Sequence, residues 1–488
     1  MKNLQNLFKG IDYRIISGEL TGDITELVYD SRLVVEGCIY VAVFGASFDG
    51  HDFINDALAN GARAVVVERD ISLKTDKLVI RVEDTRLALA YLSAAYFDFP
   101  AREIDVIGVT GTKGKTTCTY MVKKALDCAG LFCGLMGTNE TIIGDEHIHA
   151  LNTTPESYII HRDLRRMADM GMKYCVMEAS SQGFLMKRTA GLPFKAGIFT
   201  NLTPDHIGPN EHEDFDDYLN CKAMLFKQCE IGIVNADDKY TGDILKDNSC
   251  KVISSYGIEN TADYMAGDIE YIREPGKLGT LFKVIARESF NITIPLPGSF
   301  SIYNALACIC ACKMLGIDTD IIKTALKDIK VKGRIELVET GRDFSLIIDY
   351  SHNAVALESI LKVLRESCAG RLITIFGCGG NRDRQRRFSM GRVSGECSDL
   401  TVITSDNPRF EDPKDIMKDI KFGIEPTGGE YIMIEDRGEA VKYAVSHAKS
   451  GDIILLAGKG HEDYQEIQGE RHYMDELSLC KNALNAIL

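Results

Sequence analysis

Short apolar segments, each followed by glycine or polar residues, recur through the central part of the chain. The segment 104–109 runs into a glycine-rich loop, after which a helix is predicted at about 116–129. Further apolar segments at 174–178, 197–201 and 231–235 are predicted to be buried strands. Buried strands that alternate with helices indicate a parallel sheet, in which functional groups gather at the carboxyl ends of the strands.

Two other parts of the chain show different patterns. Residues 1–98 combine short apolar strands at 38–43 and 64–68 with a helix at 53–59, which predicts a small α/β unit. Residues 265–297 alternate apolar and polar positions between prolines, and this alternation predicts antiparallel strands.

The last part of the chain returns to the parallel-sheet pattern. A helix is predicted at about 301–315 and a domain boundary near residues 332–334. Beyond them, four apolar strands alternate with helical stretches, at 345–349, 372–376, 400–404 and 453–457. We therefore predict an α/β protein of three domains: a small N-terminal α/β domain, a central parallel-sheet domain and a C-terminal Rossmann-like domain, at residues 1–98, 99–332 and 333–488.

Composition and charge restrict the class of protein. Hydrophobic residues make up 45% of the 488 residues and charged residues 26%, as in a folded globular protein. The sequence has no run of about 18 apolar residues and no apolar secretory signal, so we expect a cytoplasmic protein that does not enter a membrane. The net charge of −15 would repel a polyanion, which argues against a nucleic-acid partner.

Two local clusters allow more than one interpretation. The fifteen cysteines are scattered without a Cys-x-x-Cys pair. Cys308, Cys310 and Cys312 are therefore interpreted as small core residues in preference to a metal site. The basic run at 382–387 is either a solvated face or a site for a small anion.

A glycine-rich loop with the character of a phosphate-binding loop follows the segment 104–109. It opens the predicted helix and consists of Gly111, Thr112, Lys113, Gly114, Lys115, Thr116 and Thr117. Backbone N–H groups at a helix N-terminus bind phosphate; Lys115 is expected to neutralise the β- and γ-phosphates, and the Thr116 hydroxyl to bind Mg²⁺. No Asn-Lys-x-Asp run, which usually reads guanine, is present, so ATP is the predicted nucleotide and the central domain is expected to be P-loop ATPase-like.

From this loop onward the chain resembles the Mur ligases, which build the peptide stem of bacterial cell-wall precursors. The resemblance covers essentially the whole chain and is closest to the MurE type. Seven further segments agree with the family in order and spacing: Asp30-Ser31-Arg32, Asn152-Thr153-Thr154-Pro155, Glu178-Ala-Ser-Ser181, Thr200-Asn-Leu-Thr-Pro-Asp-His206, Asp349-Tyr-Ser-His-Asn353, Asp406-Asn407-Pro408-Arg409 and Gly458-Lys-Gly-His-Glu462.

The resemblance implies a monomeric, ATP-dependent amide ligase. Such an enzyme adds a third residue to UDP-N-acetylmuramoyl-L-alanyl-D-glutamate, and the expected residue is meso-diaminopimelate. ATP converts a substrate carboxylate into an acyl phosphate, and the amine of the incoming amino acid displaces phosphate. The protein's task is then mainly positioning and charge neutralisation.

The family also implies the catalytic and metal-binding residues. Lys115, Glu178, His206 and Lys222 would be catalytic, and Mg²⁺ would be held by Thr116, Glu178, His206 and Lys222, the lysine as a carbamate. From the residues alone, Glu178 has the alternative interpretation of a cap for a following helix, and Lys222 that of a solvated helix residue.

Binding residues are implied in all three domains. For ATP the family adds Asn304, Arg334 and Asp349 to the loop. For the UDP-muramoyl dipeptide it implies Ser31 at the uridine, and Asn152, Thr153, Thr154, Ser180 and Arg188. For the third amino acid it implies Arg382, Asp406, Asn407, Pro408, Arg409, Gly458 and Glu462, of which Arg409 is the variant associated with meso-diaminopimelate.

Simpler interpretations of some of these residues remain open. The segment 153–156 has the composition of a helix cap, Asn304 suits capping-type hydrogen bonding, and Arg334 suits an ordinary surface cation.

Three parts of the sequence depart from the usual MurE pattern: the segment 207–212, Ala354 and the segment 379–388.

Three functional hypotheses follow. The first is the ligase described above, and a paralogue that adds L-lysine or another amino acid, or acts on another acidic peptide, is its variant. The second is a polyglutamate- or cyanophycin-type ligase of the same superfamily, against which the segments 30–32 and 406–409 argue. The third is a catalytically silent nucleotide-binding protein, against which intact Lys115, Glu178, His206 and Lys222 argue.

Overall fold

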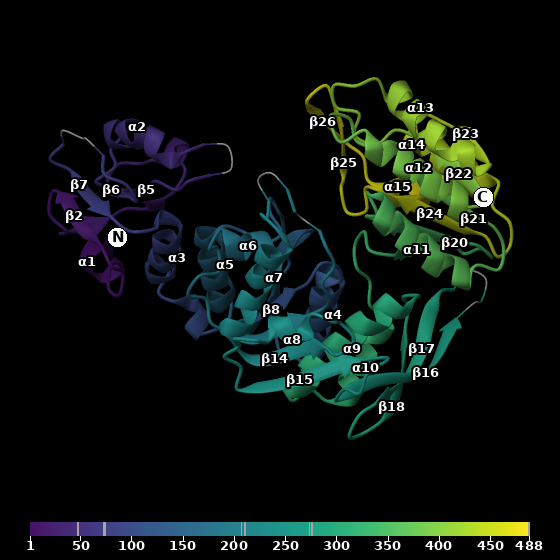
Figure 1. The fold of residues 1–488 in the computed structure, drawn as a ribbon, viewed down its shortest axis with the longest axis horizontal. Coiled ribbons are helices and arrows are strands. Elements are labelled where there is room, and N and C mark those ends of the chain that lie inside the picture. Colours follow the sequence, from purple (N-terminus) through teal and green to yellow (C-terminus); the bar gives the residue numbers. More distant parts are fainter. Residues whose placement is uncertain are drawn as a thin grey trace. The chain divides into compact units, whose positions relative to one another are not determined.

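The structure, a computed structural model, describes residues 1–45, 48–71, 75–205, 207, 208, 211–272, 274 and 277–486 (Figure 1). His206, which the resemblance implies as a metal ligand, lies outside the described residues. The chain divides into two compact units, described separately below. The first is Met1–Asp263 with Ala307–Asp318, and the second is Tyr264–Leu306 with Thr319–Leu488.

The first unit begins with a small sheet. Its strand order is β2 (Arg14–Ser17), β7 (Leu78–Arg81), β6 (Ala64–Val67), β5 (Ile39–Val41) and β4 (Leu27–Val28), with only β2 antiparallel to its neighbour. Ala64 and Val66 pack with residues of α3 (Thr85–Tyr96), whereas Val65 and Val67 pack with residues of α2 (Ile54–Ala59). Because helices cover both faces, β6 is a continuous apolar segment without alternation.

The larger sheet of the first unit is the predicted parallel sheet. Its parallel strands, in spatial order, are β9 (Cys133–Met136), β12 (Tyr174–Glu178), β8 (Asp105–Thr110), β13 (Phe194–Phe199), β14 (Cys229–Asn235) and β15 (Val252–Gly257). The strands β10 (Glu140–Ile143) and β11 (Glu146–His149) continue it as an antiparallel hairpin beside β9. The helices are α4 (Lys115–Cys128), α5 (Ser157–Asp169), α6 (Ser181–Leu185), α7 (Phe215–Ala223) and α8 (Thr241–Ile244).

One predicted strand of this sheet was misplaced. The strand expected at 197–201 is β13, which ends at Phe199. Thr200 and Asn201 leave the ladder because their polar groups bind the loop after β8: Thr200 Oγ1 donates to Lys113 O at 2.7 Å, and Asn201 Oδ1 accepts from Lys113 N at 3.0 Å.

The second unit starts with the antiparallel strands that the alternating pattern predicts. The strands β16 (Tyr264–Ile272), β17 (Gly279–Ile285) and β18 (Phe290–Ile294) form an antiparallel meander. The helix α9 (Ser299–Met314) follows and begins two residues before the predicted start at 301. Cys308, Cys310 and Cys312 lie in the later part of α9, which belongs to the first unit, and are fully buried, as expected of small core residues. The helix α10 (Thr319–Lys327) completes this region.

The C-terminal sheet carries the second parallel pattern. Its order is β19 (Glu336–Val338), β20 (Ser345–Asp349), β24 (Ile453–Ala457), β21 (Leu372–Phe376), β22 (Leu400–Ile403) and β23 (Tyr431–Met433), with only β19 antiparallel. The helices are α11 (Ala354–Ser367), α12 (Gln385–Cys397), α13 (Pro413–Ile424), α14 (Arg437–Ser446) and α15 (Glu476–Asn485), and β25 (Tyr464–Ile467) and β26 (Glu470–Tyr473) form a hairpin.

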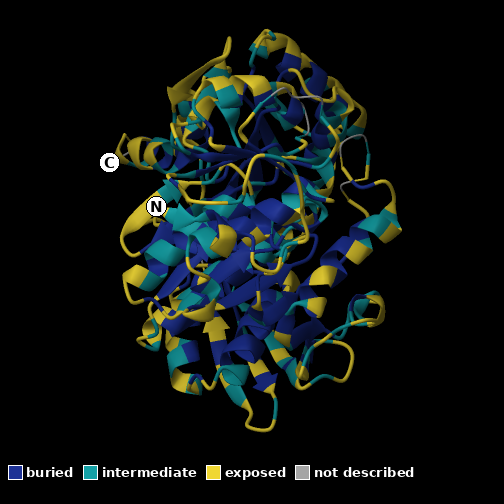
Figure 2. Ribbon diagram, turned by 90° about the vertical axis from the view of Figure 1, so that its left-hand side faces the viewer, coloured by how far each residue is buried: buried dark blue, intermediate teal, exposed yellow. Residues whose placement is uncertain are grey.

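The sequence analysis located the interior strands of this sheet better than its edges. The predicted strands at 345–349, 372–376 and 453–457 coincide with β20, β21 and β24, whose residues are all buried (Figure 2). The edge strands β19 and β23 were missed because they are short and only partly buried, so they lack a continuous apolar run. No helix in the described part of the chain is long and apolar enough to cross a membrane.

A buried histidine makes the stability of the first unit depend on pH. His161 of α5 is 3% exposed, and burial lowers its pKa from 6.5 to about 4. Between these two values the unfolded chain binds a proton that the native protein does not, so stability falls as the pH falls. We expect unfolding at pH 5.5 to cost about 1 kcal/mol less than at pH 7 on this account.

Urea unfolding at both pH values measures this effect. His161→Leu should reduce the loss of stability between pH 7 and pH 5.5, whereas His149→Leu, at an exposed position of β11, should leave it as in the wild type. An identical loss in wild type and His161→Leu would show that His161 is not responsible.

Candidate nucleotide and amino-acid sites

The loop between β8 and α4 has the backbone geometry of an anion-binding loop. Gly111 and Gly114 adopt positive φ angles of 146° and 86°, and α4 begins at Lys115. A Cβ atom on Gly111 would lie 2.0 Å from Thr200 Oγ1, so no larger residue fits at this position. Lys115 Nζ donates to Gly111 O at 2.8 Å and to Thr112 O at 3.0 Å. The helix N-terminus and the ammonium group of Lys115 therefore lie at the same place, which favours bound phosphate.

Glu178 ends β12, the neighbour of β8, and is 1% exposed. Its Oε1 accepts from Thr116 Oγ1 at 3.0 Å and from Thr138 N at 2.8 Å, and its Oε2 accepts from Thr138 Oγ1 at 3.1 Å. These bonds do not cap a following helix: α6 is capped by Ser180, whose Oγ accepts from Gly183 N. Glu178 is thus a buried carboxylate that contacts the hydroxyl group at the start of α4.

Lys222 of α7 is not a solvated residue: it is 1% exposed. Its Nζ donates to Gly111 O at 2.9 Å and lies 4.4 Å from the centre of the Tyr218 ring. Burial and the nearby charge of Lys115 lower the pKa of Lys222 well below its usual value. The structure therefore brings Lys115 and Lys222 to the same carbonyl oxygen, that of Gly111.

The residues implied for the sugar-peptide lie beside Glu178. Thr154 Oγ1 donates to Glu178 O at 2.8 Å and is 2.9 Å from Ser180 Oγ. Arg188 donates through Nη1 to Thr154 O and through Nε to Glu156 Oε1, both at 2.9 Å. Glu156 is the residue before α5 but makes no capping bond through its side chain, so these threonines form a network with the strand end and not a simple helix cap.

The remaining implied substrate residues of the first unit are less enclosed. Thr153 Oγ1 is 3.0 Å from Thr138 Oγ1, which links it to the hydroxyl that binds Glu178. Asn152 is exposed. Ser31 starts a short 3-10 helix in the N-terminal domain, whose cap is Asp30.

The residues implied for the adenosine part of ATP lie in the second unit. Asn304 is 5% exposed within α9, and Asp349 ends β20 with Oδ2 accepting from Ile335 N at 2.9 Å. The guanidinium carbon of Arg334 lies 4.8 Å from the centre of the Tyr350 ring. Arg334 is therefore held at an aromatic ring and is not simply a surface cation.

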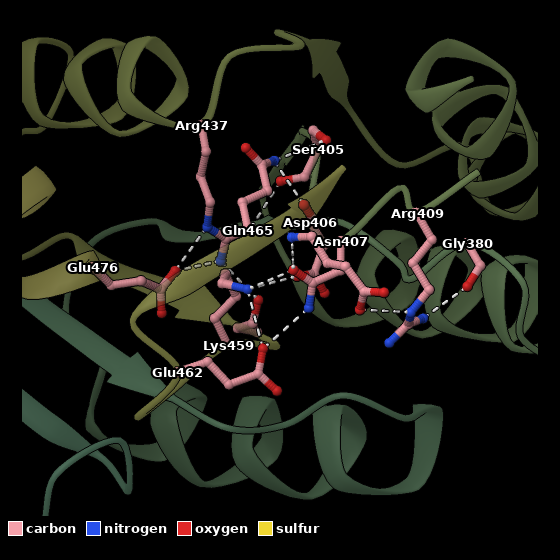
Figure 3. Close-up of polar contacts among 12 residues, drawn as sticks. Gly380, Ser405, Asp406, Asn407, Arg409, Arg437, Lys459, Glu462, Gln465 and Glu476 are labelled. Carbon is pink, nitrogen blue, oxygen red and sulfur yellow. Dashed lines mark hydrogen bonds and ion pairs between the residues drawn. The ribbon is translucent and has the colours of Figure 1, made fainter. Parts of the chain in front are cut away.

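Of the residues implied for the third amino acid, Asp406, Asn407, Arg409 and Glu462 gather at the carboxyl ends of β22 and β24 (Figure 3). Asn407 Nδ2 donates to Glu462 Oε2 at 3.1 Å, and a Cβ atom on Gly458 would lie 3.6 Å from Asp406 Oδ2. The carbonyl oxygen of Pro408 would lie 1.9 Å from a Cβ on Gly380, which fixes glycine at that position. The predicted convergence of strand ends is therefore present for these loops.

Arg409 stands in a strained but well-held conformation. Its φ is 53°, its Nε donates to Glu466 Oε2 at 3.1 Å, and its Nη1 donates to Gly380 O at 2.7 Å. Figure 3 shows its third guanidinium nitrogen, without a drawn contact, directed away from both partners. A non-glycine residue rarely adopts positive φ, and such strain is concentrated at functional sites.

The basic run 382–387 is only partly a solvated face. Arg384 and Arg387 both form ion pairs with Asp419, and Arg387 is 3% exposed and also pairs with Glu411. Arg382 is exposed, and its Cγ would lie 3.7 Å from a Cβ on Gly379. Two arginines of the run thus anchor α12 to α13, which excludes the whole run as a single anion site.

Sequence reasoning missed three residues that hold these sites together. Thr138 donates to both carboxylate oxygens of Glu178, through its backbone N and its Oγ1. The ring of Tyr218 faces Lys222 Nζ, and its Oη lies 3.0 Å from Thr112 Oγ1. Lys459 is fully buried among the residues implied for the third amino acid. Their positions in the sequence could have identified two of them, since Thr138 follows the end of β9 and Lys459 lies within the 458–462 motif.

The chain matches three family descriptions along its length. Residues 23–97 match "Mur ligase family, catalytic domain", residues 109–312 match "Mur ligase middle domain", and residues 333–460 match "Mur ligase, glutamate ligase domain". Together these matches span the N-terminal, central and C-terminal parts of the fold.

Individual relatives are similar over the full length. The UDP-N-acetylmuramoyl-L-alanyl-D-glutamate--2,6-diaminopimelate ligases of Clostridium perfringens and Clostridium botulinum are each 41% identical to the chain; the matches cover 99% of this chain and 99% and 100% of the relatives. A solved structure of a ligase with the same name is 30% identical, with a TM-score of 0.74, over 100% of this chain and 99% of that one. With its three-domain α/β architecture, the chain belongs to the Mur ligase family.

Proposed function

We propose that this chain is an ATP-dependent ligase that joins meso-diaminopimelate to UDP-N-acetylmuramoyl-L-alanyl-D-glutamate through an acyl phosphate. The observation that carries the proposal is the meeting of Lys115, Thr116, Glu178 and Lys222 around the glycine loop. The names of the full-length relatives, which are ligases of 2,6-diaminopimelate, supply the substrates.

The groups around the loop suit Mg²⁺, a hard cation that prefers oxygen ligands. The Thr116 hydroxyl and the Glu178 carboxylate supply oxygen atoms at one place, since they lie 3.0 Å apart. We propose that these two residues, His206 and Lys222 as a carbamate hold Mg²⁺. The ion would supply positive charge to the phosphates of ATP, and the ammonium group of Lys115 would add a second positive charge at the N-terminus of α4.

Carbamylation is supported by the environment of Lys222. An ammonium group would repel Mg²⁺, whereas a carbamate offers two oxygens to it. The lowered pKa increases the fraction of neutral amine, whose nitrogen adds to the carbon of CO₂ and then loses a proton.

We further propose the remaining site assignments and the division of the chain. The loop Gly111–Thr117 with Asn304, Arg334 and Asp349 binds ATP. Ser31, Asn152, Thr153, Thr154, Ser180 and Arg188 bind the UDP-muramoyl dipeptide. Domains at 1–98, 99–332 and 333–488 are supported by the three family matches at 23–97, 109–312 and 333–460. The active form is proposed to be a cytoplasmic monomer.

The C-terminal cluster is proposed to bind the third amino acid through Arg382, Asp406, Asn407, Pro408, Arg409, Gly458 and Glu462. Arg409 offers a guanidinium nitrogen beyond those engaged by Glu466 and Gly380, and this cation suits a carboxylate. Glu462 engages Asn407 through one oxygen, and Figure 3 shows the other oxygen directed away from the cluster, where it suits an ammonium group. A cation and an anion at one site match a zwitterionic amino acid.

Phosphate release tests the function directly. Purified protein with ATP, Mg²⁺ and the UDP-muramoyl dipeptide should release phosphate only when an amino acid is added. Among meso-diaminopimelate, L-lysine, L-ornithine and D-amino acids, meso-diaminopimelate should give the highest kcat/KM. Stimulation by L-lysine alone would replace the proposed substrate, and no stimulation by any amino acid would reject the ligase assignment for these substrates.

Arg409→Asn should raise the KM for meso-diaminopimelate about tenfold to a hundredfold, because a charge-assisted contact to a carboxylate is lost. Asparagine is chosen because it tolerates the left-handed conformation of residue 409 better than alanine. The KM for ATP should stay within about twofold, since Arg409 lies at the proposed amino-acid site. Steady-state kinetics with each substrate varied in turn measures both values.

Arg392→Asn, at an exposed position of α12, is the matched control and should change neither constant. Equal increases in both KM values for Arg409→Asn would remove Arg409 from the amino-acid site.

A further inference from the structure

A buried lysine lies at the centre of the C-terminal cluster. Lys459 follows β24, and its side chain is fully buried. Its Nζ donates to Asp406 Oδ1 at 3.3 Å, to Asn407 Oδ1 at 3.1 Å and to Glu462 Oε2 at 3.1 Å (Figure 3). A lysine ammonium group has three N–H donors, so these three acceptors use its full capacity. Lys459 therefore has no donor left for a substrate.

The acceptors of Lys459 belong to two loops that are distant in sequence. Asp406 and Asn407 follow β22, and Glu462 follows β24 three residues after Lys459. Asp406 and Glu462 are both anionic, with side chains that are 12% and 19% exposed. Two carboxylates that share one partner would repel each other without the cation between them. Lys459 therefore holds the two loops together.

The same contacts fix the orientation of the Asn407 amide. Because Lys459 can only donate, the atom of Asn407 that faces it must be the oxygen, and Nδ2 is then turned toward Glu462 Oε2. The Asn407 oxygen also accepts from Glu466 N at 2.9 Å, and the Glu466 carboxylate holds Arg409 Nε. A chain of contacts thus runs from Lys459 through Asn407 and Glu466 to Arg409.

A second buried cation supports the backbone of the same loops. Arg437, at the start of α14, donates to Ala457 O at 3.1 Å and forms a fully buried ion pair with Glu476 of α15. Gln465 Nε2 donates to Asp406 O at 2.6 Å and to Ser405 Oγ at 3.1 Å. The backbone has these supports of its own, so the side-chain contacts of Lys459 act on the orientation of Asp406, Asn407 and Glu462.

We propose that Lys459 is a positioning residue for the third amino acid: it sets Glu462, and through Asn407 and Glu466 it sets Arg409, in the orientation that binds a zwitterion. This inference rests on the proposed function of the cluster. Lys459 itself does not touch the amino acid, because its donors are used inside the protein.

Kinetics of Lys459→Met and Lys459→Gln test the proposal. Methionine keeps the apolar stem and removes the charge, and glutamine removes the charge but keeps an amide NH₂ group that can donate. The KM for meso-diaminopimelate should rise about 30-fold or more in Lys459→Met and less in Lys459→Gln, because breaking a buried charge contact is costly. The KM for ATP and the kcat at saturating amino acid should stay within about twofold. Lys414→Met, at an exposed lysine of α13, should leave all constants unchanged.

A double-substitution cycle separates positioning from general stability. In a Glu462→Gln background, Lys459→Met should raise the KM for the amino acid by a smaller factor than in the wild type, since the group it positions is already altered. Additive effects, an unchanged KM, equal losses toward ATP, or failure of both Lys459 variants to give folded protein by circular dichroism would overturn the proposal. Wild-type activity with meso-diaminopimelate is measured first, so failure of the proposed function is recognised separately.

Discussion

Glu178→Gln is expected to reduce kcat/KM for ATP-dependent phosphate release by about 10²–10³-fold, because it removes a negative charge proposed to hold the Mg²⁺ that stabilises the developing charge on phosphate. The carboxylate is buried and contacts the Thr116 hydroxyl at the start of α4. A neutral amide at this position cannot offset the charge of Mg²⁺. The apparent affinity for Mg²⁺ should fall together with the rate, and a titration with MgCl₂ at fixed ATP measures it.

Glutamine is the informative substitution because it preserves the local hydrogen bonds. Its oxygen can take the place of Oε1, which accepts from Thr116 Oγ1 and Thr138 N. Its NH₂ group can donate to Thr138 Oγ1, a hydroxyl that both donates and accepts. The fold should therefore persist, and the far-ultraviolet circular dichroism of the variant should match that of the wild type.

Glu140→Gln provides the matched control. Glu140 of β10 is a partly buried carboxylate of the same sheet that accepts from Tyr120 Oη at 2.5 Å and lies outside the proposed site. Its replacement should leave the Mg²⁺ titration unchanged. Wild-type Mg²⁺ affinity and rate in Glu178→Gln would falsify the proposed metal role of Glu178.

Lys222→Ala is expected to lose activity about 10²-fold or more, and short carboxylic acids should restore part of it. If the carbamate supplies oxygens to Mg²⁺, a formate or acetate ion in the space left by the side chain can supply them instead. That space is enclosed, since Lys222 is 1% exposed and lies over the Tyr218 ring. Phosphate release in a series of formate and acetate concentrations measures the restoration.

Lys222→Met removes the side-chain nitrogen without leaving the space that Lys222→Ala leaves for an added acid. Methionine fills the volume of the lysine stem, so added acids should not restore its activity. Lys227→Ala, at an exposed lysine of the following turn, should remain fully active. Absence of restoration in Lys222→Ala at any acid concentration, or equal restoration in both Lys222 variants, would contradict the carbamate.

The strands and loops that carry the sites could be predicted from the local pattern of apolar and polar residues. Continuous apolar segments end at Glu178, Asp349 and Ala457, and polar motifs follow each of them. Burial on both faces produces such segments wherever helices cover a parallel sheet, so their type and position follow from nearby residues alone. The error at 197–201 arose because Thr200 and Asn201 extend the segment in sequence while their polar groups bind the phosphate loop instead.

Contacts between residues that are distant in the sequence could not be predicted from the local pattern. Thr138 and Glu178 meet because β9 pairs with β12 in a particular register, and a shift by one residue would turn Glu178 to the opposite face. The burial of Lys222 likewise depends on the packing of α7 against the loop, since nine residues of helix do not reveal which face is covered. Motif resemblance named both residues, but their contacts required the fold.

By itself the sequence determined the α/β class, the parallel strands with their terminal loops, and the glycine loop at the start of α4, because each depends on local periodicity or on a short motif. Only the tertiary structure decided how charges are shared among these loops. Lys459 lies 52 residues from Asn407 and 53 from Asp406, yet all three acceptors of its ammonium group are within hydrogen-bonding distance. The sheet brings the ends of β22 and β24 to one edge, and burial there requires every charge to find a partner.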